Sequence, residues 1–300
     1  MLLRRASLVI ATSVVAALAL AGCGSNSLDK TGGAKKATVD TGVDKAAAAM
    51  VPKAIKDKGT LVIGTDASYA PSEFLAADGK TVQGFDVDLF NAVAKKLGLK
   101  TQWQPAKFDS IITGVEGKKY DMGVSSFTVN ADRMKQVNMV SYFNAGTQWA
   151  AAPGNPKNVD PQKPCGLTVA VQKGTVQQEE DLPPKEKACK AQGKPIKVLV
   201  YVGQDQATAA VATGKADAML ADSPVVAYAV KQSGGKIEAA GDIYDAAPYG
   251  YVIPKDETDL ANAIVAALKS LDASGDYKKV LQTWGVDAGA ISDFAVNPSV

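Results

Sequence analysis

The chain of 300 residues carries 33 Lys and Arg against 31 Asp and Glu, and it contains no histidine. This near balance of charge argues against nucleic acid or an anionic membrane face as the main partner. Without histidine the chain cannot build a zinc site on imidazole, a Ser-His-Asp triad or a histidine general base.

The first 22 residues are predicted to be a signal peptide. A basic start with Arg4 and Arg5 precedes an apolar run that is short for a membrane span and ends in small residues. The residues LAGC at 20–23 fit a bacterial lipobox, in which Cys23 is acylated and becomes the new first residue. A plain signal peptide and a signal anchor are the alternatives. Cleavage removes both arginines, so the mature chain has 31 basic and 31 acidic residues.

Residues 23–54 are predicted to carry the lipidated cysteine and a flexible tether. Residues 24–50 contain almost no large apolar side chains, so they cannot build a core. An alanine run near the end of this segment can begin a helix. The folded part then spans about 250 residues, which is enough for two domains.

Strand and helix patterns alternate along the folded part. The apolar run TLVIGT at 60–65 predicts a buried parallel strand. The segment at 85–99 predicts a helix, because Leu89, Val93 and Leu97 recur on one face. The later patterns are a short helix and a strand in 109–126, a strand in 165–175, a helix, a strand and a helix in 206–235, and two helices in 260–285. The alternation predicts an α/β fold with parallel strands.

Two cysteines, Cys165 and Cys189, remain in the predicted fold. An exported chain lies in an oxidising compartment, where an even pair of cysteines is typical of a disulfide. Closing such a loop would stabilise the fold by about 3 kcal/mol in the chain-entropy model. Two free, buried thiols are the alternative, and the spacing excludes a CxxC metal site.

Polar and aromatic residues follow four of the predicted strands. They are GTDASY at 64–69, VSSFT at 124–128, QKGTVQ at 172–177 and LADS at 220–223. In open α/β sheets, ligands bind outside the carboxyl ends of the strands. The repetition therefore predicts one shared cleft.

Arg133 is the only arginine of the mature chain, in which all other basic residues are lysines. Its planar guanidinium can hold a carboxylate through two parallel hydrogen bonds, which lysine cannot do. Ser125, Ser126 and Thr128 offer hydroxyls and backbone groups near the same strand end. Together these residues are typical of a carboxylate-binding site.

A second group of residues suits the opposite pole of a zwitterion. Asp222 ends a predicted strand and can receive an ammonium group, while the tight turn at 174–176 can present backbone N–H groups to an anion. Tyr69 and Phe108 can enclose a ligand side chain between them. Each residue also has a simpler interpretation: Arg133 as a surface ion-pair partner, Asp222 as a helix N-cap, and the aromatic residues as core.

The segment GFDVDLFNAVAKKL at 84–97 resembles the signature of the family 3 solute-binding proteins of ABC importers, which take up polar amino acids. Its own role looks structural. The similarity extends over roughly residues 55–286, and the other segments that resemble the family, in family order, are TDASYAPSEF, KFDSIITGV, DMGVSSFTVNADR, AVQKGTVQ, DAMLADSP, PYGYVIPKD and GDYKKVLQTWG.

The resemblance implies a two-lobed, type II periplasmic-binding-protein-like fold, in which each lobe is a sheet flanked by helices. Lobe 1 would comprise residues 55–147 and 253–300, and lobe 2 would comprise residues 148–252. Two crossing strands, near 147–151 and 250–254, would join the lobes and act as a hinge.

The resemblance also implies roles for single residues. Arg133 would clasp the ligand carboxylate, Ser126 and Asp222 would take the amine, and Asp66 would reach the far end of a glutamine or a basic ligand. The implied ligand-binding residues are Asp66, Tyr69, Phe108, Ser125, Ser126, Thr128, Arg133, Gln172, Gly174, Thr175, Val176, Gln177 and Asp222.

Three positions depart from the pattern of the family. Val176 replaces a Thr or Gly, Gln172 stands where glutamine binders carry Lys, and Ser72 replaces a Phe. The ligand therefore stays open between a glutamine-like and a basic amino acid.

The resemblance further implies a monomer without cofactor or metal, anchored through Cys23 at the outer face of the bacterial cytoplasmic membrane, in an extracellular or periplasmic position. Its partners would be a small-molecule amino acid and the permease subunits of the importer. Two alternatives remain: a cyclohexadienyl (prephenate or arogenate) dehydratase on the same fold, with Glu73 as the candidate acid, and a surface ligand sensor or adhesin.

Overall fold

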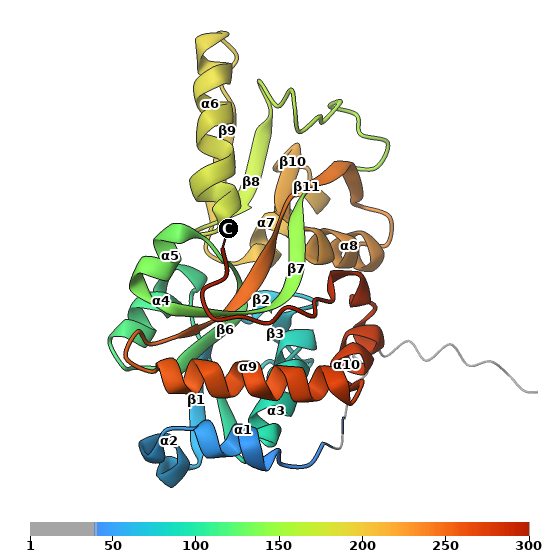
Figure 1. The fold of residues 1–300 in the computed structure, drawn as a ribbon. Coiled ribbons are helices and arrows are strands. Elements are labelled where there is room, and N and C mark those ends of the chain that lie inside the picture. Colours follow the sequence, from blue (N-terminus) through green and yellow to red (C-terminus); the bar gives the residue numbers. More distant parts are fainter. Residues whose placement is uncertain (1–38, 40, 300) are drawn as a thin grey trace, which may run out of the picture. The chain divides into compact units, whose positions relative to one another are not determined.

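The computed structural model describes residue 39 and residues 41–299 (Figure 1). The predicted signal peptide and Cys23 lie outside the described residues. The first elements are α1 (Lys45–Met50), α2 (Lys53–Lys58), β1 (Thr60–Thr65), β2 (Ser68–Tyr69), β3 (Glu73–Leu75), β4 (Val82–Gln83), α3 (Phe85–Lys96), β5 (Lys100–Pro105), α4 (Phe108–Glu116), β6 (Met122–Thr128), α5 (Ala131–Gln136) and β7 (Asn138–Ala151). The remaining elements are β8 (Thr168–Gln172), the π-helix η1 (Gln177–Asp181), α6 (Leu182–Ala191), β9 (Lys197–Tyr201), α7 (Gln204–Ala212), β10 (Ala218–Asp222), α8 (Ser223–Gln232), β11 (Glu238–Ile253), α9 (Thr258–Ala273), α10 (Asp276–Trp284) and the 3₁₀ turn η2 (Asp287–Gly289).

One mixed sheet of eight strands runs through the described chain in the order β5-β1-β6-β11-β7-β10-β8-β9. At one end β1 pairs in parallel with β5 and β6, and at the other end β8 pairs in parallel with β9 and β10. The two long strands between these sets, β7 and β11, run antiparallel to each other (Figure 1). The predicted α/β fold with parallel strands is therefore confirmed, with an antiparallel ladder at its centre.

The strands β7 and β11 carry the chain from one parallel set to the other. From Thr147 onward β7 pairs with β10 of the second set. The strand β11 pairs with β6 of the first set from Tyr249 onward. The crossings expected near 147–151 and 250–254 lie at the C-terminal ends of β7 and β11.

Helices cover the sheet with the apolar faces that the sequence predicts. Leu89, Phe90 and Val93 of α3 are fully buried, and they share one core cluster with the apolar face of α9. Each such side chain contributes roughly 1.5–3 kcal/mol of burial free energy. The helix α3 ends at Lys96, before the expected position 99, because Gly98 takes a left-handed conformation with φ of 71°. Separate clusters pack around β8 and β10 at the other end of the sheet.

Gly84 explains the structural role of the signature segment. It has φ of 142°, and a Cβ atom on it would lie 1.9 Å from the backbone oxygen of Ser72. This close approach lets the N–H groups of Phe85 and Asp86 donate to the carbonyl oxygens of Pro71 and Ser72, at 3.0 and 3.1 Å. The start of α3 is thereby fixed against the chain that leads into β3.

The predicted disulfide is confirmed. Cys165 and Cys189 are bonded, and they join the segment before β8 to α6 across a separation of 24 residues. Among the helices that the structure describes, none is both long and apolar enough to cross a bilayer.

Candidate functional site

A small cavity collects most of the residues implied as ligand-binding. Its volume is about 10 Å³, close to the space that one water molecule needs. Its lining residues are Tyr69, Phe108, Ser126, Thr128, Arg133, Thr175, Val176, Gln177 and Asp222. The other four implied residues, Asp66, Ser125, Gln172 and Gly174, are not part of this lining.

Arg133 reaches the cavity from α5, whose first turn is capped by Asn130. Its Nη1 donates to the Thr128 carbonyl oxygen at 2.7 Å, and its Nη2 donates to the Gly174 carbonyl oxygen at 3.0 Å. The guanidinium lies over the ring of Phe108, 5.5 Å from its centroid. Two of its five N–H groups thus donate to backbone carbonyl oxygens.

The surface ion-pair interpretation of Arg133 is wrong. Only 7% of the residue is exposed, and it forms no ion pair with a carboxylate of the described residues. Its neighbour Asp132 pairs with Lys135 instead. Burial lowers the pKa of Arg133, against the nearby charges of Glu179 and Glu180, but a guanidinium still stays protonated in a protein. The site therefore contains a buried positive charge.

Asp222 supplies a buried negative charge at the same cavity. It stands at the N-cap position of α8, but its side chain makes no cap hydrogen bond. Its carboxylate accepts from the Tyr69 hydroxyl at 2.8 Å, the Tyr249 hydroxyl at 2.7 Å and the Gln177 amide at 2.8 Å. Burial raises the pKa of Asp222, while these hydrogen bonds lower it. All three donors are neutral, so they orient the carboxylate without balancing its charge.

Asp66 and Gln172 contact each other rather than the cavity. The Oδ2 atom of Asp66 accepts from the Gln172 amide at 2.9 Å and from the Phe108 N–H at 3.0 Å, and its Oδ1 accepts from Ser68. Burial raises the pKa of Asp66, and the hydrogen bonds from Ser68 and Phe108 oppose that shift. The carboxylate is therefore held by neutral donors of Ser68, Phe108 and Gln172.

The serines and the glycine turn fix backbone geometry around the cavity. Ser125 accepts the N–H of Asp66 at 2.9 Å. Ser126 has φ of 51°, an uncommon value for a residue other than glycine. Gly174 has φ of 79°, and a Cβ atom there would lie 3.0 Å from that of Asp109, so a side chain would press on α4.

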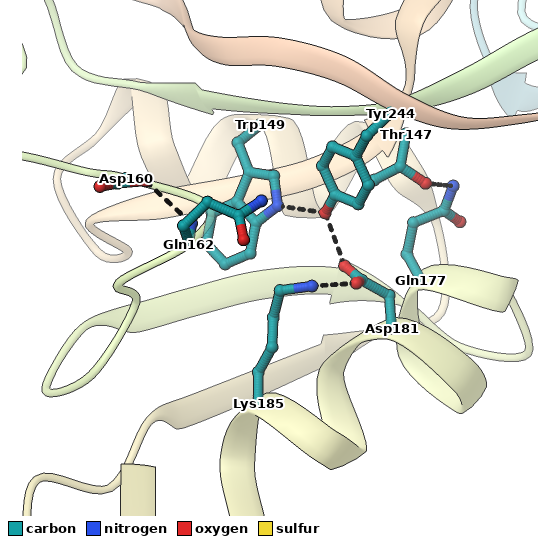
Figure 2. A network of polar contacts seen from close by, with 8 residues as sticks. All are labelled: Thr147, Trp149, Asp160, Gln162, Gln177, Asp181, Lys185 and Tyr244. Carbon is teal, nitrogen blue, oxygen red and sulfur yellow. Dashed lines mark hydrogen bonds and ion pairs between the residues drawn. The ribbon is translucent and has the colours of Figure 1, made fainter. Parts of the chain in front are cut away.

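The pi-helix η1 joins the cavity to the two long strands. Gln177, at its start, donates to the hydroxyl of Thr147 in β7 at 3.1 Å. At its end, Asp181 accepts from the Tyr244 hydroxyl at 2.7 Å, and Tyr244 in turn accepts from Trp149 at 2.7 Å (Figure 2). Both ends of η1 are thus held by side chains of β7 and β11.

Tyr249 and Asp86 are residues that the sequence did not single out as part of the site. Tyr249 lies on β11 and reaches Asp222 only because β11 runs beside β6 and β7. Asp86 lies in the first turn of α3 and accepts the N–H of Ser126 at 3.2 Å. No local pattern marks either contact, because each joins segments far apart in the sequence.

The cavity is therefore lined by a guanidinium and a carboxylate, both buried, and by aromatic rings and hydroxyls. An α-amino acid carries the two complementary charges at a fixed separation. Such an arrangement is complementary in charge to a zwitterion.

Residues 61–287 match the model of the bacterial extracellular solute-binding proteins, family 3. Over 250 residues the chain is 40% identical to the arginine-binding protein ArgT of Corynebacterium glutamicum, covering 83% of this chain and 82% of that protein. Over 233 residues it is 30% identical to the lysine/arginine/ornithine-binding periplasmic protein of Escherichia coli K12, covering 75% and 87%. The solved structure of an ancestral arginine-binding protein bound to arginine matches with a TM-score of 0.70 and 30% identity, covering 76% of this chain and 98% of that chain.

These relatives agree with the fold and with a binding function. The similar solved structures are type II periplasmic amino-acid binding proteins, which confirms the fold class predicted from the sequence. The relatives are binding proteins and not enzymes, so the dehydratase interpretation is set aside. The chain belongs to the bacterial extracellular solute-binding proteins, family 3.

Proposed function

We propose that this protein captures a basic amino acid of the arginine class and delivers it to the permease of an ABC importer. One observation carries the proposal: Arg133 and Asp222 are both buried, neither has an ion-pair partner among the described residues, and both line one small cavity. Burying unpaired charges is costly, so a ligand that neutralises both is strongly favoured.

The ligand backbone is expected to lie between these two charges. The free N–H groups of Arg133, with the hydroxyl of Thr128 and the backbone at 175–176, take the carboxylate. Asp222 takes the ammonium together with the carbonyl oxygen of Ser126, because the N–H and hydroxyl of that serine already contact buried acids.

The ligand side chain is expected to run between Tyr69 and Phe108 toward Asp66. A distal cation would gain from this buried carboxylate, which already holds four neutral hydrogen-bond donors but no positive charge among the described residues. The relatives named for arginine binding support a cationic ligand over a neutral amide.

The two parallel sets of strands correspond to two lobes that close on the ligand. We assign residues 55–147 and 253–300 to lobe 1 and residues 148–252 to lobe 2, with the crossings near 147–151 in β7 and near 250–254 at the end of β11. A ligand that touches both lobes stabilises the closed state by its differential affinity for that state.

Contacts between the lobes already exist at the cavity. The Tyr69 hydroxyl reaches Asp222, and the Arg133 guanidinium reaches the carbonyl of Gly174. Each contact uses a residue that also lines or borders the cavity, so ligand binding and lobe closure share the same groups.

We further propose that the protein is exported, cleaved before Cys23 and held by lipid at the outer face of the cytoplasmic membrane, where it acts as a monomer. Replacing Cys23 by alanine is expected to release the protein from the membrane fraction of its native cell. Membrane retention of that variant would contradict the anchor.

Calorimetry with L-arginine, L-lysine, L-ornithine, L-glutamine and L-cystine tests the ligand. We expect the basic amino acids to bind most tightly and arginine, at a hundred times its Kd, to stabilise the fold by about 2.7 kcal/mol. Failure of all five to bind would refute the proposal. Uptake of labelled arginine by cells distinguishes an importer subunit from a surface sensor. Deletion of the gene would reduce uptake if the protein serves an importer and would leave uptake unchanged if it is a sensor.

A further inference from the structure

Two carboxyl groups, those of Glu73 and Asp86, lie together beneath the cavity and take no part in its lining. Both residues are fully buried, and neither forms an ion pair among the residues that the structure describes. Two ionised carboxylates in such surroundings repel each other and lose their hydration. The pair is therefore expected to hold a proton.

Local structure forces the two groups together. The N–H groups of Phe85 and Asp86 donate to the carbonyl oxygens of Pro71 and Ser72, which brings the start of β3 onto the first turn of α3. Gly84 permits this approach because it carries no Cβ atom. Glu73 follows directly after Ser72, so its side chain meets that of Asp86, and the Ser126 Oγ lies 3.3 Å from a carboxylate oxygen of each.

The hydrogen bonds indicate which carboxyl carries the proton. Oδ2 of Asp86 accepts from the Ser126 N–H at 3.2 Å and the Tyr142 hydroxyl at 2.6 Å. A peptide N–H can only donate, so Asp86 acts as an acceptor, which suits its ionised form. Glu73 contacts only hydroxyls, those of Ser125 and Ser126, and a hydroxyl can accept as well as donate.

The Ser126 hydroxyl also requires a shared proton. Its Oγ lies 3.3 Å from Oε2 of Glu73 and 3.3 Å from Oδ2 of Asp86. One hydroxyl proton cannot serve both carboxylates. If Glu73 is protonated, it can donate to the Ser126 hydroxyl, which in turn donates to Asp86, so both contacts of that hydroxyl are satisfied.

The pair acts on the site through Ser125 and Ser126. In β6 the residues 124–126 stand opposite a single residue of β11, Tyr251, and this bulge contains Ser126 at φ of 51°. Bulges of this kind redirect side chains at functional sites. Ser126 lines the cavity, and Ser125 holds the N–H of Asp66.

We propose that Glu73 and Asp86 share one proton, and that this neutral–ionised pair is a positioning device that keeps Ser126 in the conformation required for ligand binding. The positioning role of the pair in ligand binding rests on the amino-acid binding proposed above. The shared proton itself is a property of the free protein.

The direction of the titration follows from the surroundings. Burial, and next the charge of Asp86, hold the pKa of Glu73 well above its ordinary value, while burial raises the pKa of Asp86 to about 6. In the unfolded chain Glu73 ionises near its ordinary value, so folding binds a proton above that pH and stability falls as the pH rises. The other titratable groups facing the pair are Asp66, Tyr69, Tyr142 and Tyr251.

The first test uses Glu73→Gln, which mimics the protonated side chain. The ratio of folded to unfolded protein is measured for this variant and for wild type by denaturant titration without ligand. Above about pH 6.5 Asp86 is ionised in both proteins. In this range the ratio of the variant, divided by that of wild type, should rise by up to tenfold per pH unit. The exposed Glu116→Gln serves as the control and should run parallel to wild type. Parallel curves for Glu73→Gln and wild type would overturn the shared proton.

Infrared spectra should show a protonated-carboxyl band in wild type at pH 7 that Glu73→Gln lacks.

The second test measures the Kd for L-arginine. Glu73→Gln should bind within about threefold of wild type, whereas Asp86→Asn, which replaces a charged acceptor by a neutral one, should bind about tenfold or more weakly. Equal losses in both variants, or a larger loss in Glu73→Gln, would overturn the assigned roles. If wild type binds no amino acid, the proposed function fails, while the unfolding and infrared measurements still decide the shared proton.

Discussion

The hydroxyl of Tyr249 lies 2.7 Å from Oδ2 of Asp222, across a separation of 27 residues. Tyr249 belongs to β11, one of the two strands that join the parallel sets, and Asp222 ends β10 in the second set. The strand that links the two parts of the sheet therefore holds the acidic group of the cavity directly. A movement of β11 relative to β10 must change the surroundings of that carboxylate.

Tyr249→Phe is expected to make ligand binding more sensitive to acid. The variant removes a hydrogen bond that lowers the pKa of Asp222, so that pKa rises further. A ligand ammonium requires the ionised carboxylate. As the pH is lowered, the Kd should therefore begin to weaken at a higher pH than in wild type. Loss of the bond to a buried acceptor should also lower the unfolding free energy by about 1–3 kcal/mol.

Calorimetry at several pH values checks the Tyr249→Phe prediction. Tyr251→Phe is the matched control, since the buried Tyr251 hydroxyl has no hydrogen-bond partner among the described residues. That control should change neither the pH profile nor the stability by much. Superimposable profiles for Tyr249→Phe and wild type would show that Tyr249 does not tune Asp222.

Arg133→Lys is expected to weaken amino-acid binding nearly as much as Arg133→Ala. Lysine keeps a positive charge but lacks the planar fork, and it cannot satisfy the carbonyl oxygens of Thr128 and Gly174 while also holding a carboxylate in bidentate fashion. The loss should be about 2–5 kcal/mol of binding free energy in both variants. A Kd for Arg133→Lys within about twofold of wild type would refute the role of the fork.

Asp66→Asn is expected to reduce the affinity for L-arginine more than that for L-glutamine. The asparagine keeps a carbonyl oxygen for the N–H of Phe108 but removes the charge that a distal cation would meet. Arginine should lose about tenfold or more, since a hydrogen bond to a charged group is worth roughly 1.5–3 kcal/mol. Asp66→Ala is a poorer choice because it leaves Ser68, Phe108 and Gln172 without an acceptor. Equal losses for both ligands would contradict a role in side-chain recognition.

Replacing both Cys165 and Cys189 by serine is expected to lower the unfolding free energy by about 3 kcal/mol, because the unfolded chain regains the entropy of an open loop. Neither cysteine lines the cavity, so the Kd for arginine should stay close to the wild-type value. Adding reductant should destabilise wild type in denaturant titrations and leave the serine variant unchanged. A stable fold with weakened binding would show that the disulfide shapes the cavity instead.

Local patterns predicted the regular elements well. The apolar run at 60–65 coincides with β1, and the buried face formed by Leu89 and Val93 coincides with α3. Both features follow from the spacing of apolar residues, which is a local property of the sequence. The bulge between β6 and β11, at Gly250–Val252, was not predicted, because no local sequence signal marks it.

For the candidate site too, residue types and positions were predicted from the sequence, whereas long-range contacts were not. The lone arginine and the aspartate at a strand end were visible from residue type and position, and the structure places both at one cavity. The structure also shows that Asp66 and Gln172, expected to face a ligand, hydrogen-bond to each other across 106 residues. Such pairings depend on how distant segments pack, so they cannot be read from either segment alone.

The sequence by itself determined the alternation of strands and helices, the exclusion of histidine chemistry, the paired cysteines and the charges available for a zwitterion. Those properties follow from residue type and short-range spacing. Only the tertiary structure decided that Tyr249 holds Asp222, that Glu73 meets Asp86 beneath Ser126, and that Arg133 has no carboxylate partner in the described chain. Burial and long-range hydrogen bonding determine how charges are used, and both arise only when segments far apart in the sequence pack together.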